Sequence, residues 1–392
     1  MFKVVVAHRD DLVTSDAVRG VLDDCEAQLE GLVPCAGLLF SASFHDPHLI
    51  IAAVNKRFPG LELIGCTTDG EMSGQQGYRE DTLVLTLFAS DEVQISAGVG
   101  RNTSADPARA AEDAVSAASD GLVGPARLAI TLPDGMTTKA NEILTGLDAA
   151  LGGVVPLLGG MSADQVVGSK DKFETFQFFG TEVLQDSAPV LLLGGPLLFS
   201  LGVRSGWSPL GEPATVTSAD GQVLHQVDGR PAWELYQHYL GHITNEDLSG
   251  LGAYPLAVYE EDSDRFYLRV ASGVDADTGA IQLLGEVPVN ARVQITQAVR
   301  DDVIEGVSES VSDAIAQYPG ERPAVAMLFS CTGRKLALGT KTREEVLRAR
   351  DLLSLDVPIC GFYTFGEISP LKVDGSSHYH NTTFVTLLLG VD

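Results

Sequence analysis

The stretch Gly361-Phe-Tyr-Thr-Phe-Gly-Glu-Ile-Ser369 decides the fold, because the chain carries the same motif a second time as Gly65-Cys-Thr-Thr-Asp-Gly-Glu-Met-Ser73. Both copies read G-x-x-T-x-G-E-x-S, and a short apolar run precedes each of them. Five fixed positions at fixed spacing rarely recur by chance, so the repeat indicates a duplicated structural unit. We expect a fold built from related units to present its polar turns to a shared cleft.

The repeat extends on both sides of the motif. Upstream, the apolar runs at residues 38–43 and 327–332 both end in small polar residues; downstream, residues 78–87 match residues 379–388. A weaker third copy lies between the two. Its first strand is predicted at residues 128–134, and its turn at 159–165 has Ser162 for the threonine and Gln165 for the glutamate. The predicted unit is strand, polar loop, helix, strand, polar turn, strand.

The pattern predicts an α/β fold with mixed β-sheets in layers flanked by helices. Strand–helix–strand order within each unit implies right-handed parallel crossovers, and hairpin signals elsewhere make the sheets mixed. The uncharged stretch from residue 187 to 203 is broken by Gly194-Gly195-Pro196, which predicts two buried strands joined by a tight turn. The composition shifts at residues 204–211, so we predict two domains, 1–204 and 205–392.

Composition limits the classes of partner. The formal net charge is −27, so nucleic acid and anionic membrane surfaces would repel the chain. The five cysteines are odd in number and form no C-x-x-C, which argues against a disulfide framework or a structural zinc site. The N-terminus shows no signal-peptide pattern, and no apolar run reaches the ~20 residues of a membrane span. The expected location is the cytoplasm.

Polar residues at the carboxyl ends of parallel strands are the usual ligand site of open α/β sheets. After the first strands of the units, this rule selects Ser41, Ser43, Asp134, Ser330, Cys331 and Thr332; from the turns it selects Thr68, Glu71, Ser162, Asp164, Thr364 and Glu367. A structural explanation of the turns stays open. Glycine would supply a positive-φ turn, and the threonine and glutamate would bond loose backbone N–H groups.

Other residue patterns allow alternative chemistries. His378 and His380 form an H-x-H pair that would share one strand face, where it could bind a metal or haem iron, or serve only as hydrogen-bonding histidines. Cys331 is followed by Arg334 and Lys335, so its thiol pKa could be lowered, although the first copy has Ala42 at this place, which favours a small residue filling a strand end. Glu71 and Glu367 could form an acid/base pair if they meet. None of the common catalytic motifs is present, so we expect no catalytic residues.

Taken together, these segments resemble the FIST family, a sensory module of intracellular signal transduction. The resemblance covers nearly the whole chain as an N-terminal and a C-terminal FIST half. The segments that carry it are 63–71 and 155–162 in the first half, 206–211, 216–217, 227–232 and 234–236 around the junction, and 360–368 with 380–383 near the end.

The resemblance implies ligand sensing, with small ligands such as amino acids proposed for the family and some members similar to haem-based nitric oxide sensors. We therefore expect a small polar, amino-acid-like ligand and no cofactor, with haem as the alternative. The predicted ligand-binding residues are Ser330, Cys331, Thr332, Arg334, Thr364, Glu367, His380, Asn381, Thr68, Glu71, Asp134 and Ser162. The chain shows no kinase, cyclase or methyl-accepting segment, so the expected output is a separate protein such as a histidine kinase or a cyclase.

Overall fold

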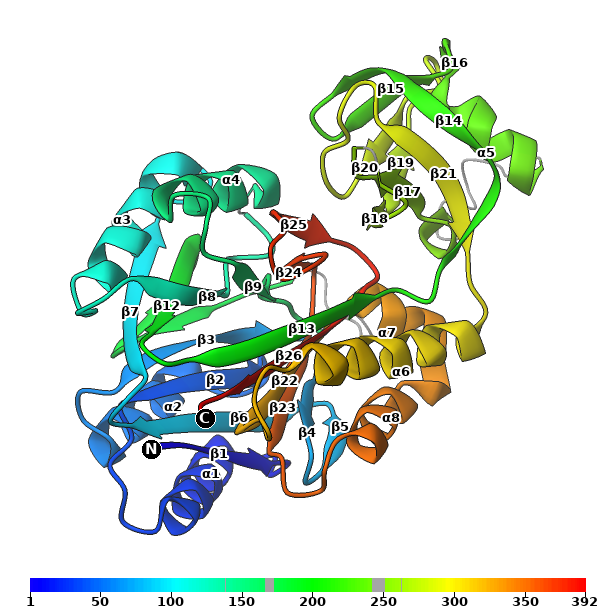
Figure 1. Cartoon of the computed structure of the whole chain (residues 1–392). Helices are drawn as coiled ribbons and strands as arrows, with labels where there is room; N and C mark the ends of the chain where they lie inside the picture. Colours follow the sequence, from blue (N-terminus) through cyan, green and yellow to red (C-terminus); the bar gives the residue numbers. More distant parts are fainter. Residues whose placement is uncertain (138, 166–172, 242–250, 262) are drawn as a thin grey trace.

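The computed structural model describes residues 1–137, 139–165, 173–241, 251–261 and 263–392. Its strands form three six-stranded sheets and one eight-stranded sheet, with helices outside them (Figure 1). The predicted α/β class with mixed, helix-flanked sheets is confirmed. No helix in the described part of the chain combines the length and apolar character that a membrane crossing needs.

The first six-stranded sheet is built mainly by the N-terminal unit. Its strand order is β1 (Phe2–Arg9), β6 (Leu83–Ser90), β2 (Ala36–Ala42), β3 (Glu62–Thr68), β10 (Gln177–Phe179) and β11 (Glu182–Leu184). Only β2 and β3 pair in parallel, and the other neighbours are antiparallel. Helices α1 (Thr14–Leu29) and α2 (Pro47–Arg57) pack their apolar faces on this sheet.

The second and third six-stranded sheets repeat this order. The second runs β7 (Gln94–Arg101), β12 (Ser187–Gly194), β8 (Ala126–Thr131), β9 (Leu157–Gly160), β24 (Glu367–Pro370) and β25 (Ser377–His380), with α3 (Pro107–Ser119) and α4 (Ala140–Ala150) outside. The third runs β13 (Leu198–Arg204), β26 (Phe384–Gly390), β22 (Val325–Cys331), β23 (Ile359–Thr364), β4 (Glu71–Ser73) and β5 (Gly77–Arg79), with α6 (Arg300–Gln317), α7 (Thr332–Leu338) and α8 (Arg343–Leu352). We number the three units in chain order by their sheets, so that the second unit contains the weaker copy of the motif at residues 128–165. That copy is therefore a full structural equivalent of the other two.

Each unit gives its hairpin to a neighbouring sheet. Hairpin β4–β5 of the first unit pairs with β23 of the third, β24–β25 of the third pairs with β9 of the second, and β10–β11 of the second pairs with β3 of the first. The three units therefore exchange hairpins in a closed cycle around a pseudo-threefold axis. This exchange could not be read from the repeat, because a motif records the strands of a unit and not the sheet that each strand joins.

The first glycine of the motif has one structural role in all three units. A Cβ at Gly65, Gly159 or Gly361 would lie 2.0–2.2 Å from a carbonyl oxygen of the neighbouring parallel strand, so only glycine fits. The second glycine does not follow the predicted positive-φ role throughout. Gly70 has φ of 123°, but Gly366 is not among the positive-φ residues and is instead covered by the ring of Tyr379.

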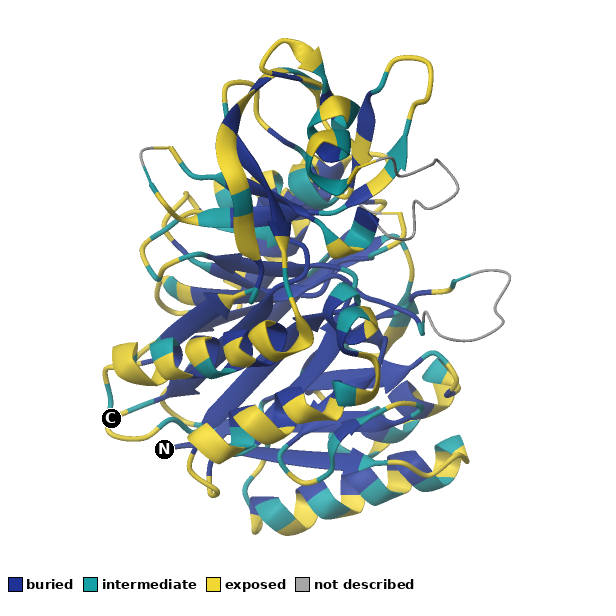
Figure 2. Cartoon of the chain, turned by 90° about the vertical axis from the view of Figure 1, so that its right-hand side faces the viewer, coloured by how far each residue is buried: buried dark blue, intermediate teal, exposed yellow. Residues whose placement is uncertain are grey.

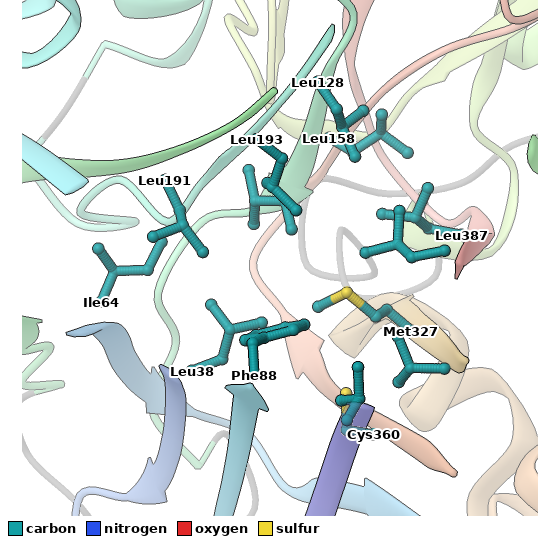
Figure 3. Close-up of a cluster of buried hydrophobic side chains, with 14 of the residues drawn as sticks. Leu38, Ile64, Phe88, Leu128, Leu158, Leu191, Leu193, Met327, Cys360 and Leu387 are labelled. Atoms are coloured by element: carbon teal, nitrogen blue, oxygen red, sulfur yellow. The ribbon is translucent and has the colours of Figure 1, made fainter. Parts of the chain in front are cut away.

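The inner faces of the three sheets share one apolar core (Figure 3). Leucine, isoleucine, phenylalanine, methionine and cysteine side chains from all three units meet there, among them Leu38, Ile64, Phe88, Leu128, Leu158, Leu191, Leu193, Met327, Cys360 and Leu387. The outer faces of the sheets are covered by helices whose far sides are exposed (Figure 2). Burial on both faces explains why the strands read as near-continuous apolar runs. It also confirms the two buried strands predicted at 187–203, which are β12 and β13.

The eight-stranded sheet forms a separate layer inserted between β13 and α6 (Figure 1). It contains β14 (Ser208–Asp220), β15 (Val223–Val227), β16 (Arg230–Pro231), β17 (Leu256–Tyr259), β18 (Phe266–Arg269), β19 (Ala271–Val274), β20 (Ile281–Leu283) and β21 (Arg292–Gln297), with helix α5 (Ala232–Leu240). The corresponding place in the first two units is a short loop, at residues 10–13 and 102–106. We call residues 205–299 the inserted domain and the rest of the chain the three-unit body.

The inserted domain rests on the three-unit body through a small apolar cluster. Trp207, Ala257 and Leu268 pack against Val303 and Ile304 of α6. The sheets thus group residues 1–204 with residues 300–392, because strands from both segments contribute to the second and third sheets. The predicted domains 1–204 and 205–392 follow the order of the sequence and not the membership of the sheets, and they stay a prediction.

Candidate functional site

The turn of the first unit is a closed hydrogen-bond network. Glu71 is fully buried, and its two carboxyl oxygens accept hydrogen bonds from the hydroxyls of Thr68 and Thr82. His8 extends the network, with Nε2 2.9 Å from Oγ1 of Thr82 and Nδ1 2.8 Å from Oγ of Ser73. No sequence pattern indicated His8, which is an isolated histidine near the end of β1. Each polar side chain in this turn has a partner, as buried polar groups require.

The turn of the second unit repeats the arrangement with an amide. Gln177 donates from Nε2 to Oγ of Ser162 at 2.9 Å and accepts at Oε1 from the Ser187 hydroxyl at 3.1 Å. Its backbone register is also equivalent, since Gln177 lies opposite Cys66 as Glu71 lies opposite Phe362.

The prediction that Gln165 replaces the glutamate was wrong. Gln165 donates to Asp81 instead, at 2.8 Å, and additional chain separates the second-unit turn from its hairpin. Spacing to the return strand could have identified Gln177. It precedes the hydroxyl partner Ser187 by 10 residues, as Glu71 precedes Thr82 by 11.

The turn of the third unit is open by comparison. Glu367 is fully buried, and its Oε2 accepts from the backbone N–H and the hydroxyl of Thr383 at 2.9 and 2.5 Å. Thr364, the counterpart of Thr68, donates to the carbonyl of Met161 at 2.6 Å and not to the carboxyl group. Within the described residues, Oε1 of Glu367 consequently has no hydrogen-bond partner.

Further unpartnered polar atoms belong to elements of the third unit, in which His380 lies opposite Glu367 in the β24–β25 pairing. They are Oγ1 of Thr332, Oγ of Ser369 and Nδ1 of His380, and each belongs to a side chain that is more than nine-tenths buried. In the first unit, both carboxyl oxygens of Glu71 accept hydrogen bonds. In the second unit, the amide oxygen of Gln177 accepts one and its amide nitrogen donates one. A buried polar atom without a partner is costly unless a ligand or water satisfies it. Of the three turns, the third is thus the one whose carboxyl group keeps an unpartnered oxygen in the described part of the chain.

Both glutamates are held largely in their neutral form. Burial raises the pKa of Glu71 to about 8 and that of Glu367 to about 8, and the hydroxyl contacts lower these pKa values only in part. Gln177 supports this reading, because an amide occupies the equivalent position in the second unit and is a neutral isostere of a protonated carboxyl group. A neutral Glu367 can donate a hydrogen bond as well as accept one.

Ser330 and Arg334 belong to a buried ion-pair network. Arg334 contacts the Glu345 carboxylate through Nε at 2.8 Å and Nη2 at 2.7 Å, and Ser330 donates to the same carboxylate at 3.0 Å. Tyr363 donates to it as well, and Arg334 also bonds the carbonyls of Ser205 and Val303. These contacts tie α7 to α8 and α6, so both side chains are already committed within the protein.

Asp134 has a similar structural commitment. Its carboxylate accepts from the backbone N–H groups of Met136 and Asp186 and from the hydroxyls of Thr137 and Thr175, at 2.7–3.0 Å. Four donors fill the capacity of a carboxylate. Asp134 therefore fixes the loop after β8, and its carboxylate needs no further hydrogen-bond donor.

The histidine pair and Asn381 lie where the body meets the inserted domain. Nε2 of His378 is 3.1 Å from Oε1 of Glu260, and Oδ1 of Asn381 accepts from the backbone N–H of Val270 at 3.1 Å. Nε2 of His380 lies 2.8 Å from the carbonyl of Ser369, and its ring centroid is 6.0 Å from that of His378. Over the residues that the structure describes, no group of three or more His, Cys, Asp or Glu could hold a metal.

The proposed activation of Cys331 is not supported. Burial raises the pKa of its thiol well above the ordinary value, and the nearby Glu367 raises it further, so a lowered pKa is wrong. The thiol accepts from the backbone N–H of Gly333 at 3.4 Å as α7 begins. Glu71 and Glu367 pair with strands of different sheets, so the hairpin exchange holds each in its own hydroxyl network.

A cavity of about 700 Å³ opens beside the third turn. It lies between the start of α6 and the end of β13 on one side and Asp264–Leu268 of the inserted domain on the other, and Thr383 is part of its wall. Thr383, whose backbone N–H and hydroxyl bond Oε2 of Glu367, connects the cavity wall to the third turn. The sequence indicated a boundary at residues 204–211 but gave no signal for a cavity there, since its walls come from distant segments.

With this geometry established, the chain can be compared with known proteins. Residues 35–230 match the FIST N domain model, and residues 232–370 match the FIST C domain model. The chain belongs to the FIST family. FIST domains are sensory modules of signal transduction, as the resemblance implied. The two matched regions meet inside the inserted domain, so the family division and the sheet grouping of this FIST protein do not coincide.

Relatives of this FIST protein occur in bacteria and archaea. An uncharacterized protein of Mycobacterium tuberculosis is 29% identical over 370 residues, covering 90% of each chain. One of Methanocaldococcus jannaschii is 30% identical over 203 residues, covering 50% of this chain and 38% of the relative. Among solved structures, a cyanuric acid hydrolase from A. caulinodans aligns over 100% of this chain and 99% of its own, with 9% identity and a TM-score of 0.38, a likeness too distant to argue from.

Proposed function

We propose that this FIST protein is a cytoplasmic sensor that binds a small polar, amino-acid-like ligand at the turn of the third unit. The observation that carries the proposal is the unpartnered Oε1 of the fully buried Glu367, together with unpartnered atoms of Thr332, Ser369 and His380 in the same unit. A ligand that supplies hydrogen bonds to these atoms would remove the cost of leaving them unsatisfied.

The equivalent turns support this assignment by contrast. Thr68 and Glu71 are saturated by one another and by Thr82, and Ser162 is bonded to Gln177. These residues of the predicted ligand set, together with Asp134, are therefore better placed to hold the units together. Within the predicted set, Cys331, Thr332, Thr364, Glu367, His380 and Asn381 lie at or beside the third turn.

The location of the third turn suggests how a signal would leave it. Asn381 bonds the backbone of the inserted domain at Val270, and Nη1 of Arg269 donates to the carbonyl of Tyr379 at 2.8 Å. A ligand that shifts residues 379–383 would therefore bias the position of the inserted domain. Sensing needs two states that bind the ligand with different affinity. A separate output protein, such as a histidine kinase or a cyclase, would read the position of the inserted domain.

Isothermal titration calorimetry against a panel of amino acids tests the proposal. We expect at least one member to bind, and Glu367→Ala or Asn381→Ala to weaken that binding by about tenfold. Glu71→Ala is the matched control, since it makes the same change in a saturated turn, and it should bind as the wild type does. Binding that both third-turn variants leave unchanged would refute the proposed site.

A further inference from the structure

The lysine and arginine side chains that are buried in the described part of the chain are Arg269, Arg334 and Lys335. Arg334 pairs with the Glu345 carboxylate at 2.7 Å, and Lys335 pairs with the Asp69 carboxylate at 2.7 Å. Arg269 is only 2% exposed, yet it forms no ion pair with any residue that the structure describes. A buried charge is costly unless an opposite charge lies beside it. Arg269 therefore differs from the other two in that its charge is not compensated.

The guanidinium group of Arg269 is held by neutral groups. Its Nε donates to the carbonyl of Glu286 at 2.8 Å, and its Nη1 donates to the carbonyls of Leu268 and Tyr379 at 3.0 and 2.8 Å. The guanidinium carbon lies 4.3 Å from the ring centroid of Tyr267 and 5.8 Å from that of Tyr379. Carbonyl oxygens and aromatic faces replace the lost hydration of a cation in part, but they do not balance its charge.

The backbone beside Arg269 is shaped to hold this group. Gly285 has φ of 149°, and a Cβ at that position would lie 2.7 Å from Nε of Arg269. Glycine therefore lets the guanidinium group pack directly against the chain. Nη2 of Arg269 makes no hydrogen bond with the described residues, so part of the donor capacity of the group stays unused. Burial lowers the pKa of Arg269, which is the direction expected for a cation that lacks a counter-ion.

The acidic residues near Arg269 do not supply the missing charge. Oε1 of Glu260 lies 3.1 Å from Nε2 of His378, whose ring stacks on that of Tyr267. Glu286 contacts Arg269 through its backbone carbonyl, and its carboxylate forms no ion pair within the described part of the protein. The geometry thus leaves a place for an anionic group that the described residues do not provide.

Arg269 also lies where the inserted domain contacts the third unit. Its Nη1 bonds the carbonyl of Tyr379, and the next residue, Val270, donates its backbone N–H to Oδ1 of Asn381 at 3.1 Å. His380, between these two partners, is the cross-strand neighbour of the turn glutamate in the β24–β25 pairing. An anion at Arg269 would therefore lie beside the segment that connects the third turn to the inserted domain.

We infer that Arg269 binds the carboxylate group of the ligand, in the joint between the inserted domain and the β24–β25 hairpin. This inference rests on the proposed function and specifies the ligand as a small carboxylate. An arginine guanidinium suits a carboxylate because its N–H groups can donate to both oxygens. The rest of the ligand would extend past Asn381 toward the third turn.

The position of Arg269 couples anion binding to the inserted domain. The ligand would reach Arg269 when the inserted domain moves away from the hairpin, because the side chain lies in the contact between them. The bound carboxylate would then offset the cost of burying the guanidinium group again. It would thus favour the closed placement of the inserted domain, which gives the two states of different ligand affinity that sensing needs.

Calorimetric titration of the full chain with glycine, alanine, serine and glutamine, each beside its α-carboxamide, tests the inference. We expect at least one amino acid to bind, and its carboxamide, which lacks the negative charge, to bind at least about tenfold more weakly. Arg269→Gln should weaken amino-acid binding to a similar degree and leave carboxamide binding unchanged. Arg265→Gln is the matched control, because Arg265 also donates to a carbonyl of the third unit, at Leu371, but is exposed. It should bind as the wild type does.

A second measurement does not depend on the identity of the ligand. Urea denaturation in sodium acetate, compared with sodium chloride at equal ionic strength, should give a higher midpoint for the wild type and for Arg265→Gln, because an anion that binds the folded state stabilises it. Arg269→Gln should show no difference between the two salts. An equal shift in Arg269→Gln would mean a general salt effect, and a shift with sodium phosphate but not with acetate would indicate a phosphoryl group; either result would overturn the inference.

The outcomes separate this inference from the proposed function. Equal binding of an amino acid and its carboxamide by the wild type would overturn the inference even if Arg269→Gln does not fold. Equal loss of both ligands in Arg269→Gln would mean a structural role and would overturn it as well. Amino-acid binding that needs Glu367 but not Arg269 would overturn the inference and leave the proposed function standing. Carboxylate binding that Arg269→Gln abolishes and Glu367→Ala does not affect would overturn the third-turn site and keep the anion site.

Discussion

The first and third turns have the same five motif residues and different hydrogen-bond networks. In the first, Glu71 is bonded by Thr68 and Thr82; in the third, Glu367 is bonded by Thr383 on one oxygen, and Thr364 bonds a carbonyl instead. The motif therefore fixes the position of the carboxyl group and leaves its partners to the surroundings. The first turn is saturated by its own side chains, and the third leaves Oε1 of Glu367 without a hydrogen-bond partner among the described residues.

The second turn serves as an internal reference for this comparison. Gln177 occupies the glutamate position with an amide that carries no charge at any ordinary pH. Its presence shows that a neutral hydrogen-bonding group fits this position, and burial raises the pKa of Glu71 and Glu367 in the direction of the neutral form. The difference between the turns thus lies in their hydrogen bonds.

The largest expected effect on stability comes from a comparison of two equivalent positions, Arg334 in the third unit and His45 in the first. Arg334→Ala would leave the Glu345 carboxylate buried without its cation, so we expect a loss of about 3–5 kcal/mol in the free energy of unfolding. The corresponding position of the first unit is His45, which makes two longer contacts, at 3.2 and 3.3 Å, and His45→Ala should cost about 1 kcal/mol. Urea denaturation followed by circular dichroism measures both.

The ion-pair prediction has its own control. The double variant Arg334→Met with Glu345→Leu removes both charges together and should recover much of the loss. A double variant as unstable as Arg334→Ala would show that packing, and not the unpaired charge, dominates.

The second prediction concerns pH. Because the folded pKa of Glu71 and of Glu367 is raised to about 8, the folded chain keeps protons that the unfolded chain releases above its ordinary carboxyl pKa near 4.5. The stabilisation is complete below that ordinary value and is lost as pH rises toward 8, by up to roughly 1.4 kcal/mol per pH unit for each group.

Urea denaturation between pH 5 and 8 measures this slope. Glu71→Gln and Glu367→Gln should each flatten it by a similar amount, and the double variant should flatten it further. A slope that neither substitution changes would show that both carboxyl groups are ionised in the folded protein.

The third prediction tests the difference in hydrogen bonding directly. Glu71→Ala would leave the buried hydroxyls of Thr68 and Thr82 without an acceptor, whereas Glu367→Ala would affect Thr383 alone and would remove an unpartnered oxygen. We expect Glu71→Ala to be the more destabilising by about 1–2 kcal/mol in urea denaturation. Equal losses would mean that the two turns are equally saturated.

The smallest expected effect separates two glutamines of the second unit. Gln177→Ala would remove a buried amide bonded to Ser162 and Ser187 and should cost about 1–2 kcal/mol. Gln165→Ala would remove one partly exposed contact to Asp81 and should cost less than about 0.5 kcal/mol. A larger loss of stability for Gln165→Ala than for Gln177→Ala would indicate that Gln165, and not Gln177, is the equivalent of the two glutamates.

Sequence reasoning predicted the local features of the chain well. Apolar runs predicted the strands β2, β12, β13 and β22. Local residues also set helix starts, since Asp46 and Asp106, each followed by a proline, accept from backbone N–H groups at the starts of α2 and α3. Such signals depend on residues close in sequence. Gln165 was misassigned because the turn and hairpin of the second unit are separated by additional residues, which spacing alone did not reveal.

The candidate site was predicted in part for a related reason. Glu367, His380 and Asn381 belong to the predicted ligand set, and the β24–β25 pairing places Glu367 opposite His380, next to Asn381. Ser330 and Arg334 belong to the same set, but Glu345 on α8 binds both of them, and that contact joins helices that have no shared pattern in sequence. The cavity was missed because α6 and β18, which form its walls, are brought together only by the docking of the inserted domain.

By itself, the sequence determined that the chain contains repeated strand–helix–strand units with a buried glutamate or hydroxyl at each turn, because these features follow from the spacing of neighbouring residues. The tertiary structure decided which hairpin joins which sheet, and with it whether Thr68, Ser162 or Thr364 meets the side chain at the glutamate position. A hydrogen bond forms only when the donor–acceptor distance lies within a few tenths of an ångström of its preferred value. That distance is set by strands that are far apart in the chain.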